Sequence, residues 1–165
     1  MKLKTLNTTL LLIFKDNKVL LGEKKRGFAK GTLNGIGGKQ DPGETNEQAM
    51  VRETQEEIGV TPIDYRLIGE IFFDTWYKGE HVNMHLNIYT CDKFAGKITE
   101  TDEMKPDWYD IDKVPYDKML QDDLLWMPMA IAGKKFKGNV VFNQDLVLQS
   151  HHFEETDELS DISIE

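Results

Sequence analysis

The chain has 165 residues, a length typical of one domain, and its 39% hydrophobic and 30% charged residues are typical of an ordinary globular protein. The 20 lysine and arginine residues face 29 aspartate and glutamate residues, a net charge of −9 that would repel a nucleic-acid polymer. The apolar run 9–14 is far too short to cross a bilayer, so no membrane partner is expected. With one cysteine, Cys91, and no targeting segment, we expect a cytoplasmic monomer.

The N-terminal part of the sequence predicts a β-hairpin, a glycine-rich loop and a helix in that order. Apolar runs at 8–14 and 18–21 flank the turn sequence 15–17, which favours the hairpin. The many glycines of segment 22–43 indicate irregular backbone. Thr45 is a plausible N-cap and Gly59 a plausible C-terminal stop, and no glycine or proline lies between them. This pattern predicts a helix over 46–58.

The C-terminal part predicts a mixture of strands and one more helix. We expect strands over 67–73, 82–91 and 108–111, a helix over 114–125 and a last strand within 132–142. From residue 150 the sequence is mostly acidic and polar, so we expect a domain over 1–149 and a loosely ordered acidic tail over 150–165. The alternation of strands and helices predicts an α/β or α+β sandwich.

The segment 52–57 places three carboxylates close together on the predicted helix. Residues three and four apart share one face of a helix, so Glu53, Glu56 and Glu57 project together and Ile58 faces the opposite side. Three clustered carboxylates repel each other unless a cation compensates, and carboxylate oxygens suit magnesium, which can also bind substrate phosphates. A magnesium ion would therefore join an acidic protein to an acidic substrate. The alternative is a solvated acidic helix face.

The spacing of the charged and glycine residues favours the metal site. Gly38, Glu44, the Arg52-Glu53 pair, the Glu56-Glu57 pair and the Gly59-Val60 pair are separated by five, seven, two and one residues. This spacing resembles the Nudix box. Thr54 departs from it, because Leu or Ile is usual at that position, but a threonine fits there if its hydroxyl bonds the preceding helical turn. The resemblance implies the Nudix fold, an α/β/α sandwich with a mixed central sheet.

The resemblance also assigns roles to the residues of the box. It implies that Glu53, Glu56 and Glu57 bind magnesium, or manganese in its place, with help from the carbonyl of Gly37 and with Glu103 as an additional ligand or base. Gly38, Glu44, Arg52 and Gly59 would shape the box, with Arg52 pairing with Glu44 to fasten the loop to the helix. A metal-activated water would attack phosphorus, with either Glu53 or Glu56 as the general base.

Outside the box, segments 24–28, 34–35, 102–104 and 122–123 resemble the oxidised purine nucleoside triphosphatase, or 8-oxo-dGTPase, branch of the family. The resemblance implies that Asn34 and the pair Asp122 and Asp123 read the purine base. Adjacent like charges raise one pKa, so one carboxyl of the pair can donate a hydrogen bond while the other accepts. The remaining substrate-binding residues would be Thr9, Lys24, Phe28, Gly37, Gly38, Phe73, Met84, Leu120 and Trp126.

Leu120 departs from that branch, which has a stacking tryptophan just before the paired aspartates. The expected reaction is magnesium-dependent hydrolysis of a small-molecule nucleotide such as 8-oxo-dGTP to the monophosphate and pyrophosphate. Triphosphates of 2-hydroxyadenine or methylated purines are alternative substrates. A dinucleotide or nucleotide-sugar pyrophosphatase is a rival on the same fold. A nucleotide sensor without activity is a second rival, and the three box glutamates argue against it.

Overall fold

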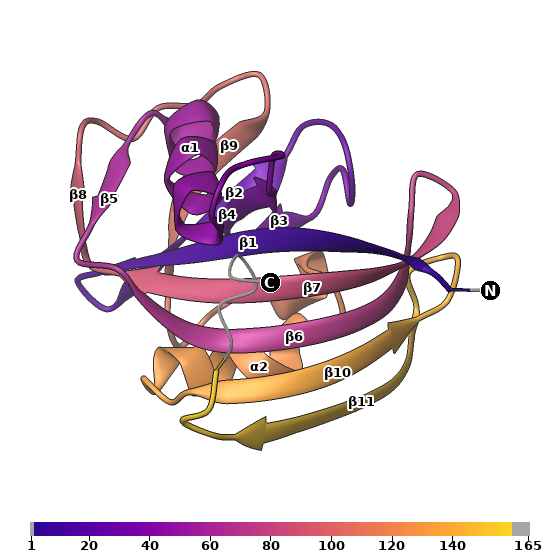
Figure 1. Cartoon of the computed structure of the whole chain (residues 1–165). Helices are drawn as coiled ribbons and strands as arrows, with labels where there is room; N and C mark the ends of the chain where they lie inside the picture. Colours follow the sequence, from indigo (N-terminus) through magenta and orange to yellow (C-terminus); the bar gives the residue numbers. More distant parts are fainter. Residues whose placement is uncertain (1, 160–165) are drawn as a thin grey trace.

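Nine strands form one mixed sheet in residues 2–159, the part of the chain that the computed structural model describes (Figure 1). The strands of this sheet are β1 (Lys4–Lys15), β2 (Lys18–Lys24), β3 (Leu33–Asn34), β4 (Ile36–Lys39), β6 (Arg66–Tyr77), β7 (Glu80–Cys91), β9 (Met104–Asp110), β10 (Phe136–Phe142) and β11 (Leu148–Glu155). Their order is β11-β10-β6-β7-β1-β2-β3, with β4 paired to β1 and β9 paired to β2. The β1–β7 and β6–β10 pairs are parallel and the others antiparallel. A separate pair joins β5 (Thr61–Ile63) to β8 (Lys93–Ala95).

The predicted N-terminal hairpin is confirmed as β1 and β2. Asp16 and Asn17 form its turn with φ of 53° and 61°, the left-handed conformation that short hairpin turns require and that Asn and Asp tolerate. β1 begins at Lys4, earlier than the apolar run suggested, because its first residues pair with β7 from Val82 onward. The longer strand places Thr8 and Thr9 in the middle of the sheet.

The predicted helix over 46–58 is confirmed as α1 (Asn46–Ile58). Thr45 accepts a hydrogen bond from the Gln48 backbone and the Gln48 side chain bonds back to Thr45, which completes a capping box. Gly59 ends the helix with φ of 77° in the left-handed region. The Thr54 hydroxyl donates to the Met50 carbonyl at 2.7 Å, as expected for a threonine in this buried position. Both ends of the acidic helix are therefore fixed.

The two helices cover opposite faces of the sheet (Figure 1), which confirms the predicted sandwich with a mixed central sheet. Side chains alternate along β1, so Leu11 and Ile13 pack on the side of α1 while Leu12 packs on the side of α2 (Asp123–Ile131). Two apolar clusters result, one on each face. Within residues 2–159 no helix is both long and apolar enough to span a bilayer.

The predicted helix over 114–125 is wrong. A 3₁₀ turn occupies Tyr116–Lys118, and the chain is extended at Met119 before α2 begins at Asp123. Pro128 lies inside α2, beyond the predicted end of the helix. The apolar residues before 123 lie in a turn and pack against the core. They do not form the apolar stripe of a regular helix. The shift places Asp122 and Asp123 at the start of the helix.

The expectation of a loosely ordered tail is wrong for residues 150–155. They belong to β11, whose main chain pairs with β10 along seven register positions. The polar side chains fit an edge strand that water covers, and the ring of Phe153 lies over Gly138, where a side chain would collide with it. Residues 160–165 of the expected tail lie outside the described residues.

Candidate active site

One cavity of about 410 Å³ runs beside the first half of β1 and brings most of the predicted site residues together. Its lining includes Thr9, Lys24, Phe28, Asn34, Gly37, Gly38, Glu53, Glu57, Phe73, Met84, Glu103, Leu120, Asp122, Asp123 and Trp126. Carboxylates of α1 lie at one end, on one face of the sheet, and the paired aspartates of α2 lie at the other end, on the opposite face. The cavity therefore connects an acidic cluster with an apolar chamber.

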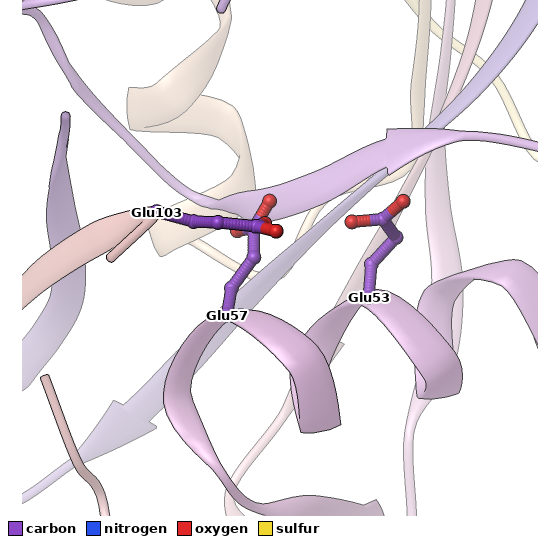
Figure 2. Close-up of side chains that lie close together, drawn as sticks. All are labelled: Glu53, Glu57 and Glu103. Carbon is purple, nitrogen blue, oxygen red and sulfur yellow. The ribbon is translucent and has the colours of Figure 1, made fainter. Parts of the chain in front are cut away.

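The acidic cluster consists of Glu53, Glu57 and Glu103 (Figure 2). One carboxylate oxygen of each residue lies within 4.8 Å of the others. Glu53 and Glu57 extend from successive turns of α1, and Glu103 reaches them from the segment just before β9. The caps at both ends of α1 fix the position of the first two carboxylates, and the pairing of β9 with β2 fixes the third.

Burial and mutual repulsion make this cluster unstable as a set of free carboxylates. Glu57 is only 5% exposed, and desolvation together with the charges of Glu53 and Glu103 raises its pKa to about 8. Burial also raises the pKa of Glu53, although the neighbouring Arg52 opposes this rise. One buried oxygen of Glu57, Oε2, has no hydrogen-bond partner among the described residues. This oxygen-only donor set fits a hard divalent cation.

The glycines of β4 let the loop approach the cluster closely. A Cβ atom at Gly38 would lie 2.6 Å from the Glu53 carboxylate, and one at Gly37 would lie 1.9 Å from the Thr9 carbonyl oxygen. Any side chain at either position would collide with these groups. The main chain of Gly37 also hydrogen-bonds Glu57, which works against the rise of the Glu57 pKa. Glycine is thus required where β4 passes between β1 and α1.

Arg52 fastens the glycine loop to α1, as predicted. Its Nε and Nη2 atoms donate to the two carboxylate oxygens of Glu44 at 2.9 and 2.8 Å, and Nη2 also donates to the Lys39 carbonyl. The bidentate pair lowers the pKa of Glu44. The other arm of Arg52, Nη1, lies 3.0 Å from Glu53 and 3.2 Å from Glu56.

Glu56 does not join the acidic cluster, although the helical spacing predicted that it would project with the other two. A residue four positions after Glu53 is rotated by about 40° from it around the helix axis, whereas one three positions after is rotated by about 60° in the other direction. Glu57 therefore turns inward, while the Glu56 side chain is 48% exposed and pairs with Arg52. The role of Glu56 stays a prediction.

The opposite end of the cavity holds the paired aspartates. Asp122 and Asp123 are 2% and 6% exposed, and the Trp126 indole Nε1 donates to Asp122 Oδ2 at 2.9 Å. Burial raises the pKa of Asp122 to about 6, and burial together with the charge of Asp122 raises the pKa of Asp123 further. Both shifts favour the protonated form, and a pair that shares one proton presents both a donor and an acceptor.

The sequence model of the NUDIX domain matches residues 4–129, most of the chain. The chain belongs to the Nudix family. This confirms the resemblance inferred from the spacing of the box. The matched range contains the whole acidic cluster and the paired aspartates, and it ends within α2.

This Nudix chain has relatives that align with most of its length. It is 43% identical to the oxidized purine nucleoside triphosphate hydrolase of Danio rerio, over 92% of this chain and 96% of the relative. It is 37% identical to the protein of the same name from Mus musculus, over 90% of this chain and 94% of the relative. A crystal structure of the mutator MutT protein from Bacillus halodurans superposes with a TM-score of 0.80 at 23% identity, covering 90% of this chain and 97% of that one, and shows the same fold.

Several residues of this Nudix cavity were missed by the sequence reading. Phe142 lies with its ring centre 6.1 Å from that of Phe73, and Tyr77 lies 5.7 Å from Phe28, so both add aromatic walls. Thr75 also lines the cavity. The signal for Thr75 and Tyr77 was available, because they follow Phe73 at spacings of two and four along one strand. Nothing local in the sequence places Phe142 in the cavity.

Proposed function

We propose that this Nudix enzyme hydrolyses oxidised purine nucleoside triphosphates, such as 8-oxo-dGTP, to the monophosphate and pyrophosphate, and so removes damaged nucleotides from the precursor pool. The observation that carries the proposal is that one cavity joins the carboxylate cluster of α1 to the buried aspartate pair of α2. A polyphosphate can bind at the first and a purine edge at the second. The names of the relatives from Danio rerio and Mus musculus support the same substrate class.

Glu53, Glu57 and Glu103 would hold magnesium, or manganese in its place, through their clustered oxygens. A cation held there would supply compensation of the phosphate charge and a lower pKa for the attacking water. The main chain of Gly37 and Gly38 lies beside these carboxylates and leaves room for the phosphates. Glu53 or Glu56 would take the proton from the water. Arg52, which contacts both, would orient whichever of the two acts as the base.

The purine would bind in the chamber on the α2 side of the sheet. Asp122 and Asp123 would read its polar edge with one donor and one acceptor, and Asn34, whose amide donates to Thr32 Oγ1 at 2.7 Å, would add a second polar contact. Apolar and aromatic side chains would enclose the ring: Phe28, Phe73, Met84, Leu120 and Trp126, with Thr9 at the floor. Lys24, which lines the cavity, would reach the phosphates.

The direct test compares kcat/KM for 8-oxo-dGTP and dGTP, and for 2-hydroxy-dATP and dATP, with magnesium present. Product analysis should show the monophosphate and pyrophosphate. Replacing Glu53 by glutamine should abolish turnover while the enzyme still binds the product monophosphate, because that change leaves the purine chamber intact. A ratio near one for both pairs would leave a general triphosphatase. Preference for a dinucleotide or nucleotide sugar in the same panel would overturn the substrate assignment.

We also propose that the enzyme acts as a monomer in the cytoplasm, where nucleotides are made. Support comes from its free cysteine, Cys91, which is buried and has a pKa raised to about 11 by desolvation, so it does not suit disulfide exchange. Light scattering of the purified protein and microscopy of a tagged chain would test the two parts separately.

A further inference from the structure

The C-terminal end of strand β6 forms one wall of the purine chamber. Side chains two apart on a strand share a face, and Phe73, Thr75 and Tyr77 all line the cavity. The residues between them point to the other face of the sheet. There Asp74 contacts His81, and the ring of Trp76 stacks on the His81 ring. The wall is therefore set by the register of β6 and not by a flexible loop.

Thr75 carries a buried hydroxyl with no hydrogen-bond partner among the described residues. The residue is 1% exposed, and its Oγ1 atom is one of the few buried side-chain oxygens without a partner. Its neighbours in the sheet are apolar, because Val82 lies opposite it on β7 and Phe142 follows the last residue paired with β6 on β10. A valine would fill the same volume without burying an unsatisfied polar group.

Thr8 provides the contrast. It also lines the cavity and is 7% exposed, but its hydroxyl donates to the His85 carbonyl at 3.3 Å. The other unpartnered oxygens at this cavity belong to Thr9, Glu57 and Asp122, which the Nudix resemblance assigns to substrate or metal. Thr75 shares the unpartnered state of these three residues and has no assigned role.

We propose that Thr75 is a further specificity-determining residue, whose hydroxyl hydrogen-bonds a polar edge group of the bound purine. This inference rests on the proposed function. A hydroxyl can both donate and accept, so it suits either a purine carbonyl or a ring N–H. Rotation about the Cα–Cβ bond exchanges the hydroxyl with the methyl group, so the oxygen can turn toward the base when the base enters. Thr75 stands on the sheet and the aspartate pair on α2, so the base is read from two walls.

The test uses the variants T75V and T75S, with T8V as the matched control. Affinities for 8-oxo-dGMP, dGMP and dAMP are measured by calorimetry in chelator, kcat/KM for the corresponding triphosphates is measured with magnesium, and melting temperatures are recorded. T75V should weaken binding of at least one nucleotide by about tenfold, as expected for one lost hydrogen bond. T75S should stay within about twofold of the unmodified protein. T75V should melt at the same or a higher temperature, because it removes an unsatisfied hydroxyl.

T8V should instead melt at a lower temperature and keep the ratio of affinities between nucleotides, because its hydroxyl serves the protein and not the ligand. Equal affinities of T75V and the unmodified protein for every nucleotide would overturn the proposal. A loss in T75V that is proportional for all nucleotides and accompanied by a lower melting temperature would also overturn it, since that is a structural effect. Absence of hydrolysis by the unmodified protein would refute the proposed function, while the metal-free affinities would still decide the role of Thr75.

Discussion

Replacing Glu57 by glutamine should stabilise the protein in chelator while it abolishes metal-dependent turnover. Glu57 is 5% exposed, and its pKa of about 8 is far above the ordinary value of 4.5. Between these two pH values the folded protein keeps a proton that the unfolded chain releases. The contribution of Glu57 to stability is therefore complete below pH 4.5 and is lost as the pH rises through 8. Glutamine has the same shape and no charge to lose.

The size of the effect follows from the same linkage. At pH 7 the difference in proton binding costs the unmodified protein about 3 kcal/mol relative to the glutamine variant. For a domain of this length, that corresponds to a melting temperature higher by about 6 to 12 °C in the variant. Near pH 4 the two proteins should melt together, because Glu57 is then protonated in both the folded and unfolded states.

The assay is thermal unfolding in chelator from pH 4 to pH 8.5, repeated with magnesium and a nonhydrolysable nucleotide. With nucleotide present, magnesium should further raise the melting temperature of the unmodified protein but not that of the variant, which keeps the purine chamber and loses a metal ligand. Glu56→Gln is the control, because that side chain is 48% exposed and should shift stability by only about 0.5 kcal/mol at any pH. A Glu57→Gln protein that is less stable at pH 7, by an amount independent of pH, would refute the reasoning.

Three further predictions concern the box and the purine chamber. Arg52→Lys should lower the free energy of unfolding by about 1 to 2 kcal/mol in urea, because lysine cannot replace the bidentate contact with Glu44; unchanged stability would mean that the pair contributes nothing net. Leu120→Trp should lower KM for purine triphosphates roughly fivefold, about 1 kcal/mol of added stacking, and an unchanged KM would show that the ring does not reach the base. In a pH profile of kcat/KM, activity on the preferred purine should fall as the pH drops through about 6, where Asp122 takes up a proton, and Asp122→Asn should lose this acid limb. An identical acid limb in that variant would assign the ionisation to another group.

The helix that carries the chemistry could be predicted almost to the residue. Thr45 and Gly59 are strong local signals, since an N-cap hydroxyl and a left-handed glycine act on the backbone beside them. The spacing of the box then fixes which side chains share a face. The position of Thr54 was also predictable, because its hydroxyl can bond the turn before it without help from any distant residue.

The features that could not be predicted depend on distant partners. Glu56 pairs with Arg52 four residues earlier on the same helix, as helical spacing allows, but Arg52 is also held by Glu44 of the preceding loop, and helical spacing alone does not contain that second contact. The segment 150–155 forms a strand because β10 offers it an unpaired edge. The start of α2 at Asp123 follows from how the preceding turn packs on the core.

The location of the two ends of the cavity on opposite faces of the sheet has a consequence for how such enzymes diverge. In the proposed function, α1 and β4 carry the cleavage of the phosphates, and β6, β7 and α2 carry the choice of base. The buried apolar side chains of α1 and β4 pack in one cluster and those of α2 pack in the other. Mutations can therefore remodel the choice of base without disturbing the hydrolytic apparatus, so a descendant can acquire a new substrate while it inherits its reaction unchanged.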